Sequence, residues 1–271
     1  MTRIAKRCML VTGASSGIGY ATASFFVNQG WVVYGLSRSG KVPAGVKPLV
    51  ADVTNGLLVQ EVLAAVFATT GRLDVVVNAA GIGGASSVEN IPFVEAKKIF
   101  DTNVYGTLAV MQASLPYLRQ GQHTTFIAIS SIAGVVGVPF HGIYSASKFA
   151  VEGLIESLRL ELHGTGVTAV SVCPGDTATP IIGNQYRAKP TDLPEVYQTN
   201  YEKAERAMRE SVDEGIAPLR IVETIDRIIK KSSPNPRYYV GGFIQQLAPM
   251  AKRLLPRKWF ETIMKAYYGV S

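Results

Sequence analysis

Short, almost continuously apolar runs alternate with longer segments of helical periodicity along most of this chain. Runs such as Leu73-Asp74-Val75-Val76-Val77 predict β-strands that are covered on both faces. We expect strands near residues 7–12, 31–36, 47–50, 73–77, 123–130, 167–173 and 237–240, and helices near residues 17–29, 55–69, 93–103, 106–119, 143–163 and 218–231. The alternation predicts an α/β fold in which crossover helices join the strands of a doubly wound, mostly parallel, seven-stranded sheet.

A polar segment, residues 180–217, interrupts this alternation. The pairs Glu202/Arg206 and Glu205/Arg209 have the i,i+4 spacing of ion pairs on an exposed helix, so its second half is predicted to be helical. A polar insert after a late strand is a candidate lid.

The last segment, residues 242–271, mixes apolar with basic positions and contains Pro249 and Pro256, which predicts short amphipathic helices. Residues 237–271 hold six basic residues against one acid, Glu261, so most of the formal charge of +7 lies at this end. A basic amphipathic tail can dock on an anionic membrane surface. We favour the alternative that it packs on its own domain or on a neighbouring subunit.

Composition limits the classes of protein to consider. A chain of 271 residues, 47% of them hydrophobic, can form one large core, so residues 1–241 are predicted to be a single domain. Because the positive charge gathers at one end, nucleic-acid binding is disfavoured. No apolar run reaches the roughly 18 residues of a spanning helix, and we expect no signal peptide. Cys8 and Cys173 lie in apolar runs, which favours free thiols and a cytoplasmic location.

The first predicted strand leads into a glycine-rich turn, Thr12-Gly13-Ala14-Ser15-Ser16-Gly17-Ile18-Gly19, and the first helix follows. Glycines let the backbone approach a pyrophosphate, and a helix N-terminus presents free amides and partial positive charge. An ordinary strand-to-helix turn is the alternative. The order strand, turn, helix, strand favours a dinucleotide site.

These glycines have the spacing GxxxGxG, and further short motifs follow in order along the chain. They are Asp52, Asn78-Ala79-Ala80-Gly81, Asn103, Ser131, Tyr144-Ser145-Ala146-Ser147-Lys148 and Pro174-Gly175. Over residues 7–180 the chain resembles the short-chain dehydrogenase/reductase family, in particular its NADP-preferring carbonyl reductases, which implies a Rossmann-type fold. The family usually has a second Asn where this chain has Ala79. We expect the change to be tolerated because the turn geometry rests chiefly on Gly81.

Tyr144 and Lys148 lie four residues apart, so on a helix they share one face and can reach one ligand. A phenol normally titrates near pH 10, and a neighbouring ammonium favours its phenolate form. We therefore expect Lys148 to lower the pKa of Tyr144 and to make it a usable general acid or base. For an isolated YxxxK pattern, a surface tyrosine and a solvated lysine would be the simpler interpretation.

The resemblance implies a role for each of these residues. Tyr144 would donate a proton to the substrate carbonyl oxygen, Ser131 would orient that oxygen, and Lys148 would also bind the nicotinamide ribose. Asn103 would hold a water that links Lys148 to solvent, unless its amide only bonds to backbone within the helix. Ser130 is one residue out of register with Ser131 and should face away from the site.

The second predicted strand ends in Ser37-Arg38. An NAD-selective site would place a carboxylate there, whereas Arg38 can pair with a 2′-phosphate, so we expect NADP(H); an exposed turn arginine is the alternative. By resemblance, Asp52 would bond the adenine amino group. The expected cofactor-binding residues are Gly13, Ser15, Ser16, Gly17, Ile18, Gly19, Ser37, Arg38, Asp52, Val53, Asn78, Ala79, Gly81, Tyr144, Lys148, Pro174, Gly175, Thr177 and Thr179. No metal is expected.

The candidate pocket linings are apolar or aromatic and include no obvious carboxylate. They are residues 82–85 and 132–140, His141, and the lid at 180–217 with Tyr186, Tyr197 and Tyr201. This lining favours a hydrophobic ketone or aldehyde as substrate. We expect His141 to lie on a solvent-facing loop rather than to contact the substrate, and Arg187 and Lys189 to be solvated rather than bound to an anionic head group.

Two functions of different classes remain. The first is an NADPH-dependent carbonyl reductase, which in reverse is an alcohol dehydrogenase; the second is a catalytically silent NADP-binding partner protein. A variant of the first is a peripheral membrane reductase of lipid-like substrates that docks through the basic tail. The intact set Ser131, Tyr144 and Lys148 favours the enzyme. The helix at 143–163 is apolar on more than one face, which predicts a helix-paired homodimer or homotetramer.

Overall fold

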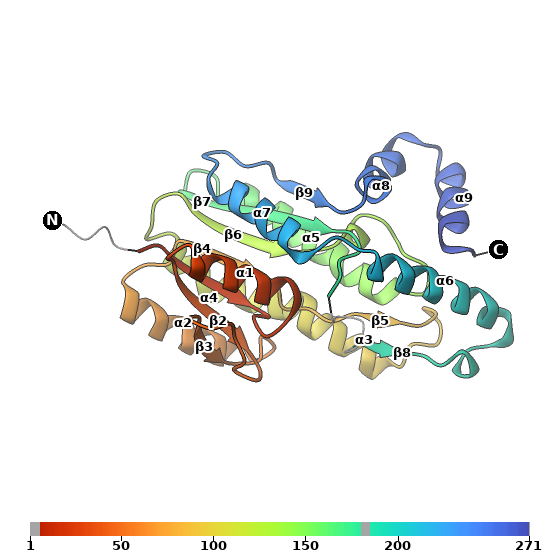
Figure 1. Ribbon diagram of the computed structural model, residues 1–271, viewed down its shortest axis with the longest axis horizontal. Helices are drawn as coiled ribbons and strands as arrows, with labels where there is room; N and C mark the ends of the chain where they lie inside the picture. The colour runs from red at the N-terminus through yellow and green to blue at the C-terminus, as the bar shows by residue number, and fades with distance from the viewer. Residues whose placement is uncertain (1–5, 180–184, 271) are drawn as a thin grey trace.

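The computed structural model describes residues 6–179 and 185–270, and its centre is a parallel sheet of seven strands in the order β3-β2-β1-β4-β6-β7-β9 (Figure 1). Their bounds are β1 Cys8–Thr12, β2 Val32–Ser37, β3 Lys47–Val50, β4 Val75–Asn78, β6 Thr124–Ile129, β7 Val167–Pro174 and β9 Arg237–Val240. Each strand overlaps a predicted one, so the expected doubly wound α/β sheet is confirmed.

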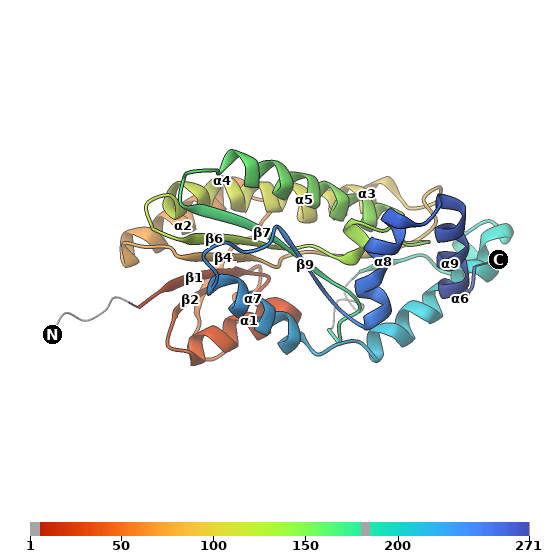
Figure 2. The ribbon, with the colours of Figure 1, turned by 90° about the horizontal axis from the view of Figure 1, so that it is seen from above.

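Helices cover both faces of the sheet, which Figure 2 shows edge-on. The helices of one face are α1 (Gly17–Asn28) and α7 (Pro218–Ile229); those of the other are α2 (Gly56–Thr70), α4 (Gly106–Leu118) and α5 (Gly142–Glu161). The ends of α2 follow local rules: the Asn55 side chain accepts a hydrogen bond from the Leu58 amide (3.1 Å), and Gly71 ends the helix with a left-handed φ of 64°.

The core explains why the strands are apolar at every position. In β1, Cys8 and Leu10 pack toward α2, α4 and α5, whereas Met9 and Val11 pack toward α1 and α7. All four side chains are fully buried. A strand covered by helices on both faces has no solvent-facing position that would favour a polar residue. Both cysteines of the chain are buried and free.

The two helices predicted at 93–103 and 106–119 are joined without a break. Helix α3 (Phe93–Phe100) passes into a π-helical turn at Asp101–Tyr105, which continues into α4. A π-turn inserts one extra residue and rotates the following side chains, and such turns occur frequently at functional sites. This one carries Asn103.

The part of the predicted lid that the structure describes begins at residue 185, and residues 180–184 lie outside the described residues. Strand β8 (Tyr186–Arg187) pairs in parallel with β5 (Gly84–Ala85), which follows β4. Two-residue strands have no detectable alternation, so the sequence pattern did not predict them. Helix α6 (Glu195–Asp213) follows in the second half of the segment, as expected.

The ion pairs expected on α6 are not formed in the described structure. Glu205 is buried and pairs with Arg187 of β8, not with Arg209 one turn away. Glu202 and Arg206 are both exposed and make no ion pair with each other. The i,i+4 spacing was correct for a helix, but it could not indicate which face of that helix is covered.

The C-terminal segment forms two short helices, α8 (Phe243–Leu254) and α9 (Arg257–Tyr268), as its pattern predicts. Pro256 precedes the first turn of α9, and Pro249 lies inside α8. Figures 1 and 2 place both helices with α6 beyond the carboxyl ends of the central strands. Within residues 6–179 and 185–270, no helix has the length and apolar character needed to cross a membrane.

Candidate active site

A crevice follows the carboxyl ends of β1, β2 and β4. Its floor is the turn between β1 and α1, where Gly13 and Gly17 have left-handed φ values of 66° and 54°. A Cβ on Gly19 would lie 2.3 Å from the Gly13 carbonyl oxygen, so the close packing of this turn requires glycine. The turn therefore presents its backbone to the crevice.

The N-terminus of α1 opens into the same crevice. Ser16 is its N-cap residue, but the Ser16 side chain makes no capping hydrogen bond, and the first turn contains no acidic residue. The first amides of a helix have no partner within the helix and carry partial positive charge. This end of α1 is therefore suited to bind a phosphate group.

Thr12 connects β1 to the loop after β4. Its hydroxyl donates to Asn78 Oδ1 (2.8 Å) and accepts from the amides of Ala79 (3.1 Å) and Ala80 (3.0 Å). Asn78 in turn donates to the Thr107 hydroxyl on α4 (2.8 Å). Because position 79 contributes only its backbone amide to these bonds, an alanine side chain fits there.

The carboxyl ends of β2 and β3 carry the residues expected at the adenosine ribose. Ser37 is buried and donates to the Lys41 carbonyl (3.2 Å), whereas Arg38 is exposed and lines the crevice. In the described part of the chain, Arg38 forms no ion pair. Asp52 accepts hydrogen bonds from the amide (3.0 Å) and hydroxyl (2.9 Å) of Thr54.

The crevice fits a dinucleotide, because glycines keep its floor open, helix amides face it, and a cation lies at its adenosine end. Of the predicted cofactor residues, it is lined by Gly13, Ser15, Ser16, Gly17, Ile18, Gly19, Ser37, Arg38, Asp52, Val53, Ala79, Gly81 and Thr179. It continues into a cavity lined by Tyr144, Lys148, Pro174, Gly175 and Thr177. Asn78 lies behind the crevice, in the Thr12 network.

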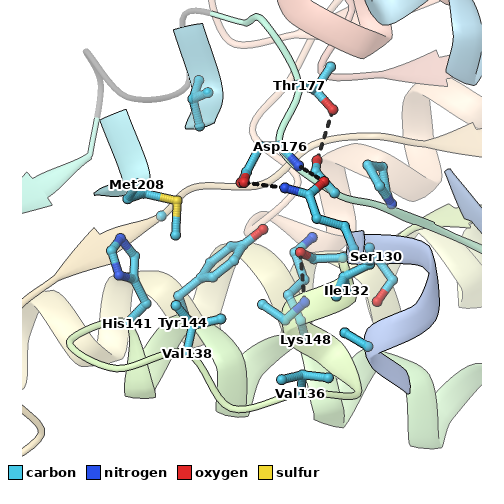
Figure 3. Close-up of a pocket in the computed structure, with 18 of the residues that line it drawn as sticks. Ser130, Ile132, Val136, Val138, His141, Tyr144, Lys148, Asp176, Thr177 and Met208 are labelled. Carbon is cyan, nitrogen blue, oxygen red and sulfur yellow. Dashed lines mark hydrogen bonds between the residues drawn. The ribbon is translucent and has the colours of Figure 1, made fainter. Parts of the chain in front are cut away.

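Ser131, Tyr144 and Lys148 meet where the crevice joins the cavity. Tyr144 and Lys148 share one face of α5, with Lys148 Nζ 5.9 Å from the centre of the Tyr144 ring (Figure 3). Lys148 Nζ donates to the Ile129 carbonyl (3.0 Å). Ser131 hydrogen-bonds Tyr144. The Ser130 hydroxyl lies beside Gly134, where a Cβ added to that glycine would be 2.9 Å away. The structure thus brings the three expected residues together. Ser130 also lines the cavity, so its expected orientation away from the site stays a prediction.

Burial dominates the protonation of this group. It raises the pKa of Tyr144, and the hydrogen bond with Ser131 opposes the shift. The expectation that Lys148 lowers the pKa of Tyr144 is wrong for this structure, because the ammonium lies beside the ring and bonds to Ile129. Burial lowers the pKa of Lys148 itself to about 8. At neutral pH, Tyr144 is therefore a protonated phenol and Lys148 is mostly charged.

Asn103 holds the loop after β4 against α5. Its amide donates to the Ile82 carbonyl (2.9 Å) and to Ser147 Oγ (3.0 Å), and its oxygen accepts from the Ile82 amide (2.8 Å). A Cβ on Gly81 would lie 3.2 Å from Asn103 Oδ1 and 3.4 Å from Lys148 Nζ. The absence of a side chain at Gly81 therefore lets Asn103 Oδ1 and Lys148 Nζ approach the loop. The water expected at Asn103 stays a prediction.

The cavity beside Tyr144 has a volume of about 340 Å³. Its walls come from the loops after β6 and β7 and from α6, α8 and α9. Most lining side chains are apolar: Ile132, Val136, Val138, Met208, Val212, Ile244, Leu247, Phe260, Ile263 and Met264. The predicted lining at 132–140 is thus present, but the contribution of α8 and α9 was missed. An amphipathic pattern indicates that one face is covered, not what covers it.

His141 is not on a solvent-facing loop, as the sequence led us to expect. It is buried, lines the cavity, and has its Nε2 atom 3.6 Å from Glu205. Glu205 would favour a charged imidazole, but Arg187 also pairs with this carboxylate, and burial lowers the pKa of His141 to about 4. Arg187 is accordingly neither solvated nor free for an anionic head group. Lys189 is exposed.

The three lid tyrosines expected in the pocket do not line it in the described structure. Tyr186, Tyr197 and Tyr201 pack with Phe140 and Ala85 in a separate apolar cluster. The Tyr201 hydroxyl also donates to the Ala188 carbonyl (2.7 Å). Their aromatic rings pack this segment against the domain outside the cavity lining.

Asp176 is a cavity residue that sequence reasoning missed. It follows Pro174-Gly175, and Gln245 of α8 accepts from its amide (3.1 Å) and donates to its carboxylate (2.5 Å). A Cβ on Gly175 would lie 2.0 Å from Gln245 Oε1, so glycine allows α8 to close over this loop. The position of Asp176 between Gly175 and Thr177 was the only signal in the sequence that could have drawn attention to it.

The location of the crevice defines the class of protein. Strand order reverses between β1 and β4, and an open parallel sheet binds its nucleotide in the crevice outside the strand ends at such a point. Residues 7–190 match the family model described as short chain dehydrogenase. The chain belongs to the short-chain dehydrogenase family, whose members are oxidoreductases that use NAD(P) and act on small substrates.

Relatives align along nearly the whole chain. The 3-ketodihydrosphingosine reductase of Bacteroides thetaiotaomicron is 35% identical over 263 residues, which cover 97% of this chain and 98% of that protein. A probable short-chain type dehydrogenase/reductase of Helicobacter pylori, VdlC, is 30% identical over 94% of this chain and 96% of its own length. A short-chain dehydrogenase from Streptomyces avermitilis superposes with a TM-score of 0.82 at 26% identity, over 99% of this chain and 100% of that one.

Proposed function

We propose that this protein is an NADPH-dependent reductase that transfers a hydride to the carbonyl carbon of a long, apolar ketone. The observation that carries the proposal is the apolar cavity that begins at Tyr144 and runs between α6, α8 and α9. Binding energy from an alkyl chain in this cavity would position the carbonyl beside Tyr144 and Ser131. The reverse reaction is oxidation of the corresponding alcohol.

The protonation of the site supports reduction. Tyr144 is a half-buried phenol with a raised pKa, so at neutral pH it holds the proton that the carbonyl oxygen must receive. Ser131, already hydrogen-bonded to Tyr144, would donate to the same oxygen. Lys148 would leave the Ile129 carbonyl to bond the nicotinamide ribose, and its positive charge would then favour the phenolate that remains after proton transfer. When bound, NADPH supplies the hydride.

The preference for NADPH rests on Arg38. Its guanidinium lines the crevice at the carboxyl end of β2 and has no ion-pair partner among the described residues. Arg pairs with phosphate through two parallel hydrogen bonds, whereas an NAD-selective site would offer a carboxylate to the ribose hydroxyls. The residues from Ser15 to Gly19 and the start of α1 would hold the pyrophosphate.

The relative from Bacteroides thetaiotaomicron supports a lipid-like substrate, because its name specifies a 3-keto sphingoid base and the alignment includes the helices that wall the cavity here. We therefore propose a long-chain ketone of the 3-ketodihydrosphingosine type.

We also keep a homodimer or homotetramer as part of the proposal, since Leu160 on the outer face of α5 is exposed.

The test measures NADPH oxidation at its absorbance maximum with 3-ketodihydrosphingosine in mixed micelles, and with a short ketone for comparison. The long substrate should be reduced, and Tyr144→Phe should lower kcat by about 1000-fold, within the range for a lost general acid. NADPH should still bind to this variant, as followed by fluorescence titration. Equal rates for Tyr144→Phe and the parent protein would refute the catalytic assignment, and binding without turnover of any ketone would favour the silent NADP-binding protein.

A further inference from the structure

Asp176 places a carboxylate in the wall of a mostly apolar cavity. Figure 3 shows this carboxylate and the Tyr144 hydroxyl on facing sides of the cavity. The two groups are close enough for the charge of Asp176 to raise the pKa of Tyr144. A substrate whose carbonyl oxygen is bonded to Tyr144 would thus have neighbouring atoms beside Asp176.

The hydrogen bonds of Asp176 leave one of its oxygens available. Ser211 of α6 and Gln245 of α8 both donate to Oδ2, each at 2.5 Å. Within residues 6–179 and 185–270, Oδ1 accepts no hydrogen bond and the carboxylate forms no ion pair. Among the described lining residues, the one cation other than the weakly basic His141 is Lys148, which bonds to Ile129.

We propose that Asp176 binds a cationic amino group next to the reacting carbonyl, so that the preferred substrates are long-chain α-amino ketones. A carboxylate in an apolar cavity is costly without a compensating cation. A substrate ammonium provides that cation, and its position on the carbon next to the carbonyl, three bonds from the carbonyl oxygen, matches a carboxylate opposite Tyr144. The inference rests on the proposed ketone reduction and adds to it a preference for substrates that carry an amino group next to the carbonyl.

The competing explanation is a purely structural role, in which Asp176 only joins its loop to α6 and α8 through Ser211 and Gln245. The two roles predict different results. A structural role affects every substrate equally, whereas ammonium binding affects only substrates that carry the amine.

The experiment compares 3-ketodihydrosphingosine with an analogue in which hydrogen replaces the amino group, for the parent protein, Asp176→Asn, Asp176→Glu and the control Ser211→Ala. The parent should prefer the amine by roughly 10-fold or more in kcat/KM, as expected for a charge-assisted hydrogen bond. Asp176→Asn should abolish this preference mainly through KM and leave the analogue nearly unchanged. Asp176→Glu should restore part of the preference, and Ser211→Ala should retain it.

A binding measurement separates this inference from the proposed function. Calorimetry with the NADP⁺ complex compares the amino alcohol product with its amine-free counterpart, so it does not depend on turnover. Tighter binding of the amine that disappears in Asp176→Asn supports the inference. Equal binding of the two alcohols, or an equal loss of both in Asp176→Asn, overturns it. Failure to reduce either ketone, with the binding preference intact, would refute only the proposed reaction.

A second inference concerns the outer side of α8 and α9. Phe243, Met250, Leu254 and Trp259 are exposed there and do not line the cavity; Leu254 is 71% and Trp259 68% exposed. The same two helices expose Arg253, Arg257, Lys258 and Lys265, and these cations form no ion pair in the described part of the chain. We call these eight residues the α8–α9 surface.

We infer that the α8–α9 surface docks on an anionic lipid bilayer. Large apolar side chains interleaved with unpaired cations are complementary to acyl chains beneath a layer of negative head groups. The inner sides of the same helices line the cavity through residues such as Leu247 and Phe260. Docking would therefore place the cavity beside the phase in which a long-chain ketone is dissolved.

The test is co-sedimentation of the whole protein with phosphatidylcholine vesicles that contain or lack phosphatidylglycerol. The protein should sediment with the anionic vesicles, and 1 M salt should reduce the bound fraction. The double variants Leu254→Ser/Trp259→Ser and Arg257→Glu/Lys258→Glu should lose most of this binding, whereas Lys97→Glu/Lys98→Glu, an equal change of charge on α3, should retain it. No sedimentation, or self-association through Leu254 and Trp259 measured by light scattering, would overturn the inference.

Discussion

The crevice beside α1 and the cavity walled by α8 and α9 adjoin each other, but they are built by different means. The crevice presents mainly backbone, with glycines that hold it open and the free amides of a helix end. The cavity presents mainly apolar side chains contributed by segments far apart in the sequence. Backbone recognition needs particular residues at fixed spacing. An apolar wall accepts many combinations of residues, so the crevice has a motif and the cavity has none.

The largest expected effect is in the crevice. Gly19→Ala would place a Cβ 2.3 Å from the Gly13 carbonyl oxygen, so the turn must shift away from the pyrophosphate site. We expect the Kd for NADPH to rise about 100-fold or more, which is about 2.7 kcal/mol, measured by fluorescence titration. Gly153→Ala on α5 is the control, because its Cβ would meet no atom within 4 Å. Unchanged affinity in Gly19→Ala would show that the turn is not a backbone site.

The next effect concerns cofactor selectivity at the adenosine end of the crevice. Arg38→Asp should weaken NADPH relative to NADH by about 30-fold in kcat/KM, because a bidentate charged pair is lost and a repulsive charge is introduced. Arg119→Asp, an exposed position at the end of α4, makes the same change of charge as a control. Unchanged selectivity in Arg38→Asp would mean that Arg38 is only a solvated turn residue and does not bind the 2′-phosphate.

A smaller effect is expected in the cavity, where each side chain contributes only contact area. Phe260→Ala should raise KM for a long-chain ketone about 10-fold, or about 1.4 kcal/mol, and leave both the short ketone and NADPH binding unchanged. Phe93→Ala, the same change at an exposed position of α3 outside the cavity lining, is the matched control. An equal change with short and long ketones would mean that α9 supports the fold and does not contact the chain of the substrate.

The smallest effect is a pH dependence of stability at the edge of the cavity. Burial lowers the pKa of His141 from its ordinary value of 6.5 to about 4, so between these two pH values the unfolded chain binds more protons than the folded one. The free energy of unfolding should therefore decrease as the pH falls from 6.5 to 4. Urea titrations should show that His141→Asn removes on the order of 1 kcal/mol of this decrease. An identical pH profile for the variant would exclude His141 as its cause.

The sequence predicted the sheet and the crevice because both depend on local rules. Strands buried on both faces are apolar at each position, as in β1, and the turn at Gly13–Gly19 follows from glycine conformation and the helix that begins there. Tyr144 and Lys148 could be placed on one face of α5 from helical geometry alone. Their protonation could not be predicted in the same way, because it depends on burial in the folded protein and on the Ser131 hydroxyl.

What this sequence determined by itself was the parallel sheet, the glycine turn and the shared helical face of Tyr144 and Lys148, since each requires only short-range spacing and backbone sterics. The tertiary structure decided the substrate side. It paired Glu205 with Arg187 and not with Arg209, buried His141, and brought Asp176 under Gln245 of α8. These contacts join segments whose distance in sequence ranges from 18 to 69 residues, and no periodicity along the chain can specify which covered face will meet which neighbour.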